Sequence, residues 1–322
     1  MDGGFSETDC APRGGHGNSG GTEAGHVPVL LNQAIEFLAV RRGGTYIDAT
    51  LGLGGHSWEI ARRLGRQGRL IGFDKDPGAI ERARPRLAQA APELASDWPA
   101  IELVHASFAL IGQQVGHASV DGVLADLGVS SLQLGDAGRG FSFQAEGPLD
   151  MRMNPESGLT AEQVVNRFDE RALADAIYEF GEERRSRRIA RAIVRARPIK
   201  TTARLADVIS AAARPMNQGD RRIHPATRTF QALRILVNRE LDDLRELLRS
   251  ALQVLRPSGR LVVISFHSLE DRIVKDALRE GAHDGLYRVL TKKPVTAEKD
   301  EIERNPRSRS AKLRAAERTG QQ

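Results

Sequence analysis

The stretch Tyr46-Ile47-Asp48-Ala49-Thr50-Leu51-Gly52-Leu53-Gly54-Gly55-His56 reads as a short apolar strand, a glycine-rich turn and the start of a helix. A second apolar strand, residues 70–73, ends at Asp74, at the spacing of about twenty residues that nucleoside-binding sheets use. Glycines in a turn let the backbone approach a ligand because they carry no Cβ. An acid at the tip of the next strand can accept hydrogen bonds from ribose hydroxyls. These features predict a nucleoside site at the edge of a parallel sheet.

The glycine spacing separates two kinds of nucleoside ligand. The dinucleotide pattern has a third glycine three residues after the second, and Ser57 stands at that place. A cofactor without a pyrophosphate, such as S-adenosylmethionine (SAM), therefore fits the turn better than NAD does. An NAD-dependent oxidoreductase is the rival enzyme class, and an ordinary turn with packing glycines is the non-functional alternative.

The order of the predicted elements indicates a doubly wound α/β sheet. Strands are expected at residues 45–49, 69–73, 101–105, 120–126, 260–265 and 287–290. Helices are expected at residues 29–40, 57–64, 77–90, 227–255 and 269–280. The sheet and its helices are therefore expected to comprise residues 26–134 and 225–295.

Three segments depart from that alternation. Residues 135–224 show no clear strand, and helical stretches occur at residues 161–179, 182–196 and 203–213, which predicts an inserted all-helical subdomain. The glycine-rich residues 1–25 cannot bury enough surface to offset their ordering entropy, so we expect them to be disordered. Residues 296–322 read as a basic C-terminal tail.

The composition restricts the classes of protein that fit. The 322 residues carry a net charge of +5 and a pI near 9.6, which weakly indicates an anionic partner. The only cysteine is Cys10, so neither a disulfide framework nor a cysteine-based zinc site is expected, and we predict no metal. The sequence shows no signal peptide and no apolar run long enough to span a membrane, so we expect a cytoplasmic protein.

Residues with chemical potential also follow the later strands. Phe108 follows the third predicted strand and could lie against an adenine, although a core phenylalanine is the simpler alternative. Asp126 ends the fourth strand, with Gln133 close behind, at the edge where α/β sheets bind ligands; a helix cap is the alternative for Asp126. Ser265 and His267 follow the fifth strand. We take Asp126, His267 and Ser265 as candidate catalytic residues. A serine hydrolase is disfavoured because no Gly-x-Ser-x-Gly elbow occurs.

The segment from Glu182 to Arg234 is strongly basic. It holds fourteen lysines and arginines against four acids, so its net charge of +10 exceeds that of the whole chain. A charge run is usually a solvated helix face, but so strong a bias of sign favours phosphate binding. The candidate RNA contacts are Arg184, Arg185, Arg187, Arg188, Arg191 and Arg228.

Short stretches along the chain match one family in order. They are His26-Val27-Pro28-Val29-Leu30, Gly54-Gly55-His56-Ser57, Phe73-Asp74, Asp126-Leu127-Gly128-Val129-Ser130-Ser131, Arg139-Gly140-Phe141-Ser142-Phe143, Leu149-Asp150-Met151-Arg152, Gly181-Glu182-Glu183, Ile223-His224-Pro225-Ala226-Thr227-Arg228, Ser265-Phe266-His267-Ser268-Leu269-Glu270-Asp271-Arg272 and Asn305-Pro306-Arg307-Ser308-Arg309-Ser310. Through them the chain resembles the RsmH (MraW) methyltransferases of bacteria over about residues 26–318.

The resemblance implies a Rossmann-like, SAM-dependent methyltransferase core with a helical insertion that recognises RNA. It implies transfer of a methyl group to the exocyclic N4 amine of one cytidine in small-subunit (16S) ribosomal RNA. The partner would be that RNA or the assembled small subunit, and a homodimer can form. The resemblance places the SAM contacts on Gly54, Gly55, His56, Asp74, Phe108, Asp126 and Gln133.

The chemistry of amine methylation gives Asp126 a role. A cytidine amine is a poor nucleophile because its lone pair is delocalised into the ring, so an acceptor for one amine hydrogen would help it to pyramidalise. Asp126 is the candidate acceptor, and Phe141 or Phe143 could stack on the base. Methylation of the ring carbon needs a cysteine nucleophile, for which Cys10 is poorly placed. The alternatives are a methyltransferase for another RNA or nucleobase amine and a non-catalytic nucleoside- or RNA-binding protein.

Overall fold

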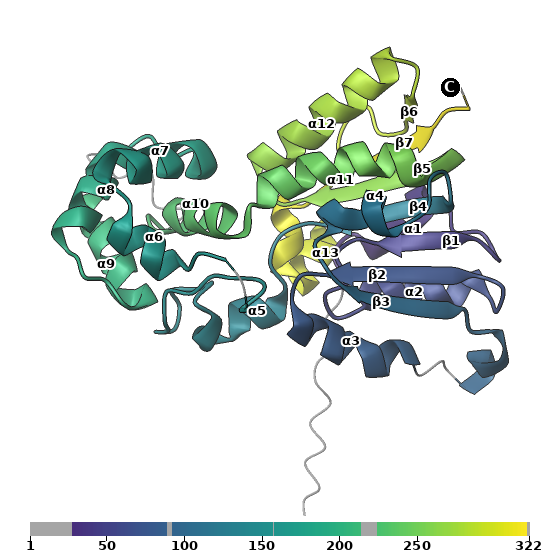
Figure 1. Cartoon of the computed structure of the whole chain (residues 1–322), viewed down its shortest axis with the longest axis horizontal. Helices are drawn as coiled ribbons and strands as arrows, with labels where there is room; N and C mark the ends of the chain where they lie inside the picture. Colours follow the sequence, from purple (N-terminus) through teal and green to yellow (C-terminus); the bar gives the residue numbers. More distant parts are fainter. Residues whose placement is uncertain (1–27, 89–91, 157, 214–223, 321–322) are drawn as a thin grey trace, which may run out of the picture.

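A seven-stranded sheet forms the centre of the molecule (Figure 1). The computed structural model describes residues 28–88, 92–156, 158–213 and 224–320, so the predicted disordered segment 1–25 lies outside the described residues. The strand order is β3-β2-β1-β4-β5-β7-β6, with β1 to β5 parallel and β7 antiparallel to both neighbours. The strands are β1 (Thr45–Asp48), β2 (Arg69–Asp74), β3 (Ala100–His105), β4 (Val120–Asp126), β5 (Leu255–Ser265), β6 (Tyr287–Val289) and β7 (Lys312–Arg318).

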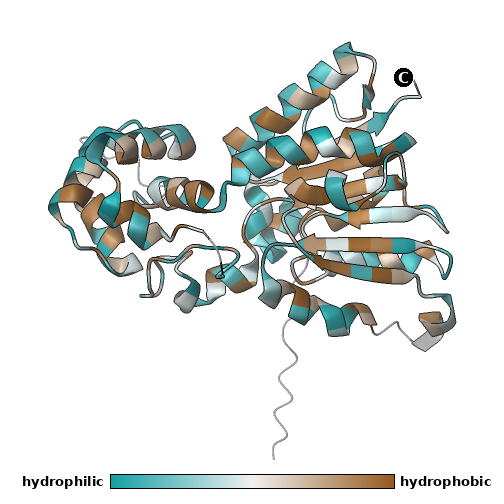
Figure 2. Ribbon diagram, in the orientation of Figure 1, coloured by the Kyte–Doolittle hydropathy of each residue, from teal (hydrophilic) through white to brown (hydrophobic). Residues whose placement is uncertain are grey.

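Helices cover both faces of this sheet, which confirms the predicted doubly wound α/β fold. One face packs against α1 (Leu31–Leu38), α2 (Gly55–Leu64) and α3 (Pro77–Ala88). The other packs against α4 (Ile111–Gln114), α11 (Glu240–Val254) and α12 (Ser268–His283). Successive strand residues alternate between the two clusters, as Tyr46 and Ile47 do. Figure 2 shows the resulting apolar strands between amphipathic helices.

Five helices form a separate unit with its own apolar cluster, which includes Val165, Leu173, Ile189, Leu205 and Leu233. They are α6 (Ala161–Arg167), α7 (Glu170–Gly181), α8 (Ser186–Arg195), α9 (Thr202–Ala212) and α10 (Thr227–Asn238). The unit lies beside the carboxyl ends of the parallel strands, next to α5 (Ser131–Gly135) (Figure 1). Among the described residues, no helix is long and apolar enough to cross a membrane.

The helical unit extends past the boundary that we expected at residue 224. A single helix was predicted over residues 227–255, but Arg239 adopts a left-handed conformation with φ of 53° and divides it into α10 and α11. The apolar face of α10 packs into the helical unit, whereas that of α11 packs on the sheet. The physical boundary between the two units is therefore Arg239.

The C-terminal segment is part of the sheet rather than the tail expected for residues 296–322. It forms α13 (Lys299–Arg304), a 3-10 turn at Pro306–Ser310 and β7, and β7 lies between β5 and β6. Its charged residues misled the prediction because they have partners inside the fold. The Arg314 guanidinium, for example, lies 2.6 Å from the carboxylate of Asp271 while Leu313 is fully buried. The remaining 3-10 turns are Pro92–Asp97, Phe108–Leu110 and Ala137–Arg139.

Candidate active site

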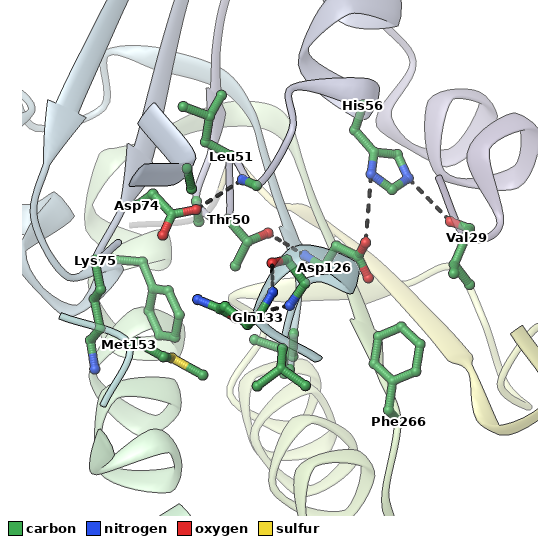
Figure 3. A pocket seen from close by; sticks show the side chains of 18 of the residues that line it. Val29, Thr50, Leu51, His56, Asp74, Lys75, Asp126, Gln133, Met153 and Phe266 are labelled. Atoms are coloured by element: carbon green, nitrogen blue, oxygen red, sulfur yellow. Dashed lines mark hydrogen bonds and ion pairs between the residues drawn. The ribbon is translucent and has the colours of Figure 1, made fainter. Parts of the chain in front are cut away.

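A pocket lies at the carboxyl ends of β1, β2, β4 and β5, beside the first turn of α11 (Figure 3). Of the predicted cofactor contacts, Gly54 alone is missing from its walls. The residues of the pocket that bear on its chemistry are Gly52, Gly55, His56, Asp74, Lys75, Phe108, Asp126, Gln133, Met153, Glu240, Phe266, Glu270 and Arg307. This position is the switch point of the sheet, where the strand order reverses between β1 and β4.

The glycine-rich turn divides its glycines between the ligand side and the protein side. Gly52 has a φ of 51°, and a Cβ added there would meet only the Thr50 carbonyl oxygen, at 3.9 Å. A Cβ on Gly54 would instead contact Ala83 and Leu87 of α3 at 3.4 Å. Gly52 therefore leaves room for a ligand, whereas Gly54 serves close packing of the turn against α3.

Asp74 closes one end of the pocket. Its two carboxylate oxygens accept hydrogen bonds from the backbone N–H groups of Gly52 and Asp76, each at 2.8 Å. Burial raises the pKa of Asp74 to about 6, while these two hydrogen bonds favour the ionised form. Each oxygen keeps a lone pair, so the carboxylate can also accept from ribose hydroxyls.

Asp126 lies at the opposite side of the glycine turn and has fewer partners. Its backbone N–H donates to the Thr50 hydroxyl at 2.6 Å, and its Oδ2 lies 3.8 Å from Nδ1 of His56. The other ring nitrogen of His56 lies 3.1 Å from the Val29 carbonyl oxygen (Figure 3). Oδ1 of Asp126 is buried without a hydrogen-bond partner among the described residues. Burial raises the pKa of Asp126 to about 8, and the charge of Arg307 opposes that shift.

Gln133 and Phe108, two of the expected SAM contacts, line the pocket. The Gln133 side-chain oxygen accepts from the Ser130 N–H at 2.9 Å, and its amide nitrogen donates to Asp76 at 2.9 Å. This capping arrangement at the start of α5 fixes the amide beside the pocket. Lys75 is held by an ion pair to Asp243 and therefore presents a neutralised charge.

Ser265 and His267 do not line the pocket, which differs from their prediction as catalytic residues. The buried Ser265 hydroxyl donates to the Lys312 carbonyl of β7 at 3.3 Å. His267 caps α12, and its Nε2 lies 3.3 Å from Glu270. The pocket is lined instead by Phe266, between β5 and α12, and by Glu270 in the first turn of α12. Although burial opposes its ionisation, hydrogen bonding from His267 and the charge of Arg234 hold the pKa of Glu270 below its ordinary value.

The two aromatic residues proposed to stack on the base also lie elsewhere. Phe141 is buried in the cluster of the helical unit, and Phe143 stacks on His224 with ring centroids 4.6 Å apart. Sequence reasoning missed Arg307, although it belongs to the C-terminal stretch that carries the family resemblance. It also missed Glu240, which forms a two-pronged ion pair with Arg234 at 2.9 Å.

The predicted RNA contacts fall into two groups. Arg184, Arg187 and Arg188 are exposed and have no ion-pair partner in the part of the chain that the structure describes. The others have protein partners: Arg185 donates to the Ala213 carbonyl, Arg191 lies 3.2 Å from Glu170, and Arg228 lies 3.9 Å from Glu183. The first group remains available for phosphates.

Three features of the pocket suit SAM: the open glycine turn, the hydrogen-bonding groups and the acidic side chains. Asp74 suits the ribose hydroxyls, and the open turn at Gly52 suits a nucleoside without a pyrophosphate. The unpartnered oxygen of Asp126 is a site for a cation or a hydrogen-bond donor. Among the described residues, no group of three or more His, Cys, Asp or Glu side chains could hold a metal ion.

The sheet order, with antiparallel β7 inserted between β5 and β6, and this pocket at the switch point define a Rossmann-like, SAM-dependent methyltransferase. The chain belongs to the MraW methylase family, whose model matches residues 23–319.

Two relatives are similar over nearly their whole length. One, from Koribacter versatilis (strain Ellin345), is 71% identical over 313 residues, which are 97% of this chain and 99% of the relative. The other, from Acidobacterium capsulatum, is 65% identical over 293 residues, which are 91% of this chain and 98% of the relative. Both are named ribosomal RNA small subunit methyltransferase H. A solved structure of a putative rRNA-methylase from Clostridium thermocellum has 13% identity and a TM-score of 0.45, with 92% of this chain and 99% of that chain covered.

Proposed function

We propose that this protein methylates the exocyclic N4 amine of a cytidine in small-subunit ribosomal RNA, with SAM as the methyl donor. The observation that carries the proposal is the half-buried carboxylate of Asp126, which lies beside the nucleoside site and whose buried Oδ1 has no partner among the described residues. The names of the relatives support the RNA class.

The side chains of the pocket suit an amine acceptor. SAM supplies an activated methyl group on a sulfonium. Asp126 accepts a hydrogen bond from the amine, so the nitrogen lone pair is freed from the ring and positive charge on nitrogen is stabilised as it develops. Asp74 and the turn at Gly52 fix the nucleoside end of the donor, and holding the two reactants in line contributes much of the acceleration.

The exposed arginines at the start of α8 support an RNA substrate. Arg187 and Arg188 lie in the first turn of this helix, and Arg184 precedes it by two residues. Cations at a helix N-terminus are disfavoured by the helix dipole, so their clustering is explained by phosphate contacts. We infer that the helical unit binds RNA and that catalysis takes place in the cytoplasm, where ribosomal subunits assemble.

Methylation of small subunits that lack the modification tests the proposal. Subunits from a strain deleted for the enzyme would be incubated with methyl-labelled SAM, digested to nucleosides and separated. We expect the label in N4-methylcytidine, and labelling by Asp126→Ala protein should be about a hundredfold to a thousandfold slower. Parallel reactions with protein-free ribosomal RNA distinguish naked RNA from the assembled subunit as the substrate. Label in a ring-carbon methylated pyrimidine or in another base would contradict the proposal.

A further inference from the structure

The strand order divides the pocket into two sides. Gly52 and Asp74 follow β1 and β2, where the nucleoside of the cofactor fits. Phe266 follows β5, Arg307 precedes β7, and both lie on the far side of Asp126. These two side chains have no role in the cofactor site described above.

Phe266 is a fixed aromatic surface. Its backbone N–H donates to Glu270 at 2.8 Å, and Glu270 is itself buried in the first turn of α12. Its ring lies against Gly128, where an added Cβ would be 3.6 Å from Cδ2 of Phe266. Figure 3 shows the ring beside the carboxylate of Asp126. A planar base that approaches Asp126 therefore meets an aromatic side chain.

Arg307 is a half-buried cation with unused donors. One guanidinium nitrogen donates to the Val129 carbonyl, in the turn that follows Asp126. Within the described ranges, no carboxylate lies within ion-pair distance of this guanidinium. Arg307 and Asp126 line the same pocket. A guanidinium has five N–H donors in a planar fork, so several remain for a ligand.

We propose that Phe266, Arg307 and Asp126 form the subsite that selects the target cytosine. This assignment rests on the proposed function. The base stacks on Phe266, Asp126 accepts from N4, and Arg307 donates to N3 and O2. Uracil presents O4 and N3–H at those positions, so it would face Asp126 with an acceptor and Arg307 with a donor. Adenine has an amine beside an acceptor but lacks an equivalent of O2.

A base analogue tests the contact to N3 directly. RNA with 3-deazacytidine at the target position lacks the N3 acceptor and keeps the amine. We expect the kcat/KM of the wild-type protein to be about tenfold to a hundredfold lower on this RNA, the cost of one good side-chain-to-base contact. Arg307→Met should be slow on both RNAs but should hardly distinguish them. The two proteins and the two RNAs together form a double-mutant cycle, which cancels the altered reactivity of the analogue.

Arg309→Met is the matched control, because Arg309 is an exposed arginine two residues away and is not part of the pocket. Arg309→Met should show the same ratio of kcat/KM between the two RNAs as the wild-type protein. Calorimetric titration with SAM shows that each variant is folded, and Arg307→Leu, which also lacks a donor, replaces Arg307→Met if the latter does not fold. Phe266→Leu should raise KM for RNA about tenfold without weakening SAM binding, and Phe266→Tyr should restore it.

The outcomes separate this subsite from the proposed function. A wild-type protein that labels no cytosine amine would overturn both. A wild-type protein that methylates cytidine, together with an Arg307→Met protein that is as sensitive to removal of N3 as the wild type, would overturn the subsite alone.

Discussion

Asp74 and Asp126 end the two strands that flank β1, and their surroundings give the two carboxyl groups different proton affinities. Burial raises the pKa of both, to about 6 for Asp74 and about 8 for Asp126. Asp74 accepts two backbone hydrogen bonds that favour its ionised form, whereas Oδ1 of Asp126 is without a partner among the described residues. A cation or an amine donor beside Asp126 would give Oδ1 the partner that it lacks among the described residues. The site is therefore completed by its ligands.

The raised pKa of Asp126 predicts a pH-dependent decrease in stability. Because this pKa rises from 3.8 to about 8 on folding, the folded protein retains a proton that the unfolded chain releases between these pH values. The contribution of Asp126 to the free energy of unfolding is thus greatest below pH 4 and falls up to about pH 8. Asp126→Asn should remove this fall, which is at most about 1.4 kcal/mol per pH unit. Urea unfolding without SAM at pH 5 to 8 measures the free energy of unfolding. Asp276→Asn, at an exposed position, is the control. The same pH dependence in the wild type and in Asp126→Asn would contradict the prediction.

Asp126→Ala, which removes the carboxylate, should reduce turnover more than it reduces RNA binding. The interaction with the amine strengthens as charge develops on nitrogen, so its removal costs about 2.7–4 kcal/mol, or roughly a hundredfold to a thousandfold in rate. Asp126→Asn keeps one acceptor oxygen and should be intermediate. Single-turnover rates at saturating SAM are the measurement, because some decrease in SAM affinity is also expected. Near-wild-type rates in both variants would make Asp126 a structural residue.

At the scale of the element, the arginines in and around α8 have two different tasks. Arg185 donates to the Ala213 carbonyl at the end of α9, and Arg197, just beyond α8, donates to the carbonyls of Val165 and Phe168. These contacts join helices within the unit. The three exposed arginines make no such contacts among the described residues, so charge alone could not tell the two groups apart.

Neutralising the exposed group should weaken RNA binding and its salt dependence. The triple change Arg184→Gln, Arg187→Gln and Arg188→Gln should lower the slope of log K against log salt by up to about one unit for each phosphate interaction that it removes. SAM affinity should not change. Arg245→Gln with Arg249→Gln is a matched control, because these exposed arginines of α11 are paired with Asp242 and Glu246. An unaltered slope in the triple variant would identify a merely solvated helix face.

The position of β7 inside the sheet makes its apolar residues part of the core. Leu313 is fully buried and pairs with Ile264 of β5. Leu313→Ala should lower the free energy of unfolding by about 2–5 kcal/mol, the cost of a buried leucine truncation. Urea unfolding is the measurement, and Glu303→Ala, at an exposed position of α13, should be near neutral. A decrease below about 0.5 kcal/mol for Leu313→Ala would be inconsistent with a core strand.

At the scale of the whole molecule, the pocket lies where two independently packed units meet. The Lys75 ammonium donates to the Asn238 carbonyl at the end of α10 at 2.8 Å, and Arg272 of α12 lies 3.0 Å from Glu182 beyond α7. Glu240, directly after the boundary residue Arg239, lines the pocket. The helical unit is thus attached to the rim of the pocket, so RNA bound to α8 would be held in a defined position relative to Asp126.

Ligand-induced stabilisation should distinguish SAM from NAD. SAM at about a hundred times its Kd should raise the free energy of unfolding by about 2.7 kcal/mol, because only the folded protein binds it. NAD should have no effect, and thermal unfolding with each ligand measures the difference.

Asp74→Ala removes a charge-assisted hydrogen bond worth about 1.5–3 kcal/mol, so affinity for SAM should fall about tenfold to a hundredfold. Calorimetry measures this affinity, and an unchanged affinity of Asp74→Ala for SAM would exclude a hydrogen bond between Asp74 and the ribose.

The sequence by itself determined six of the seven strands, the glycine turn and the two aspartates, because these depend on local signals. Runs such as Leu261–Ile264 specify buried parallel strands, and polar residues at their ends must meet at one edge. Tertiary structure alone decided which polar residues enter the pocket. Arg307 comes from a segment whose charges suggested solvent, whereas Ser265 faces β7. Side-chain direction at a strand end and pairing between distant segments arise only when the chain packs, so no local pattern records them.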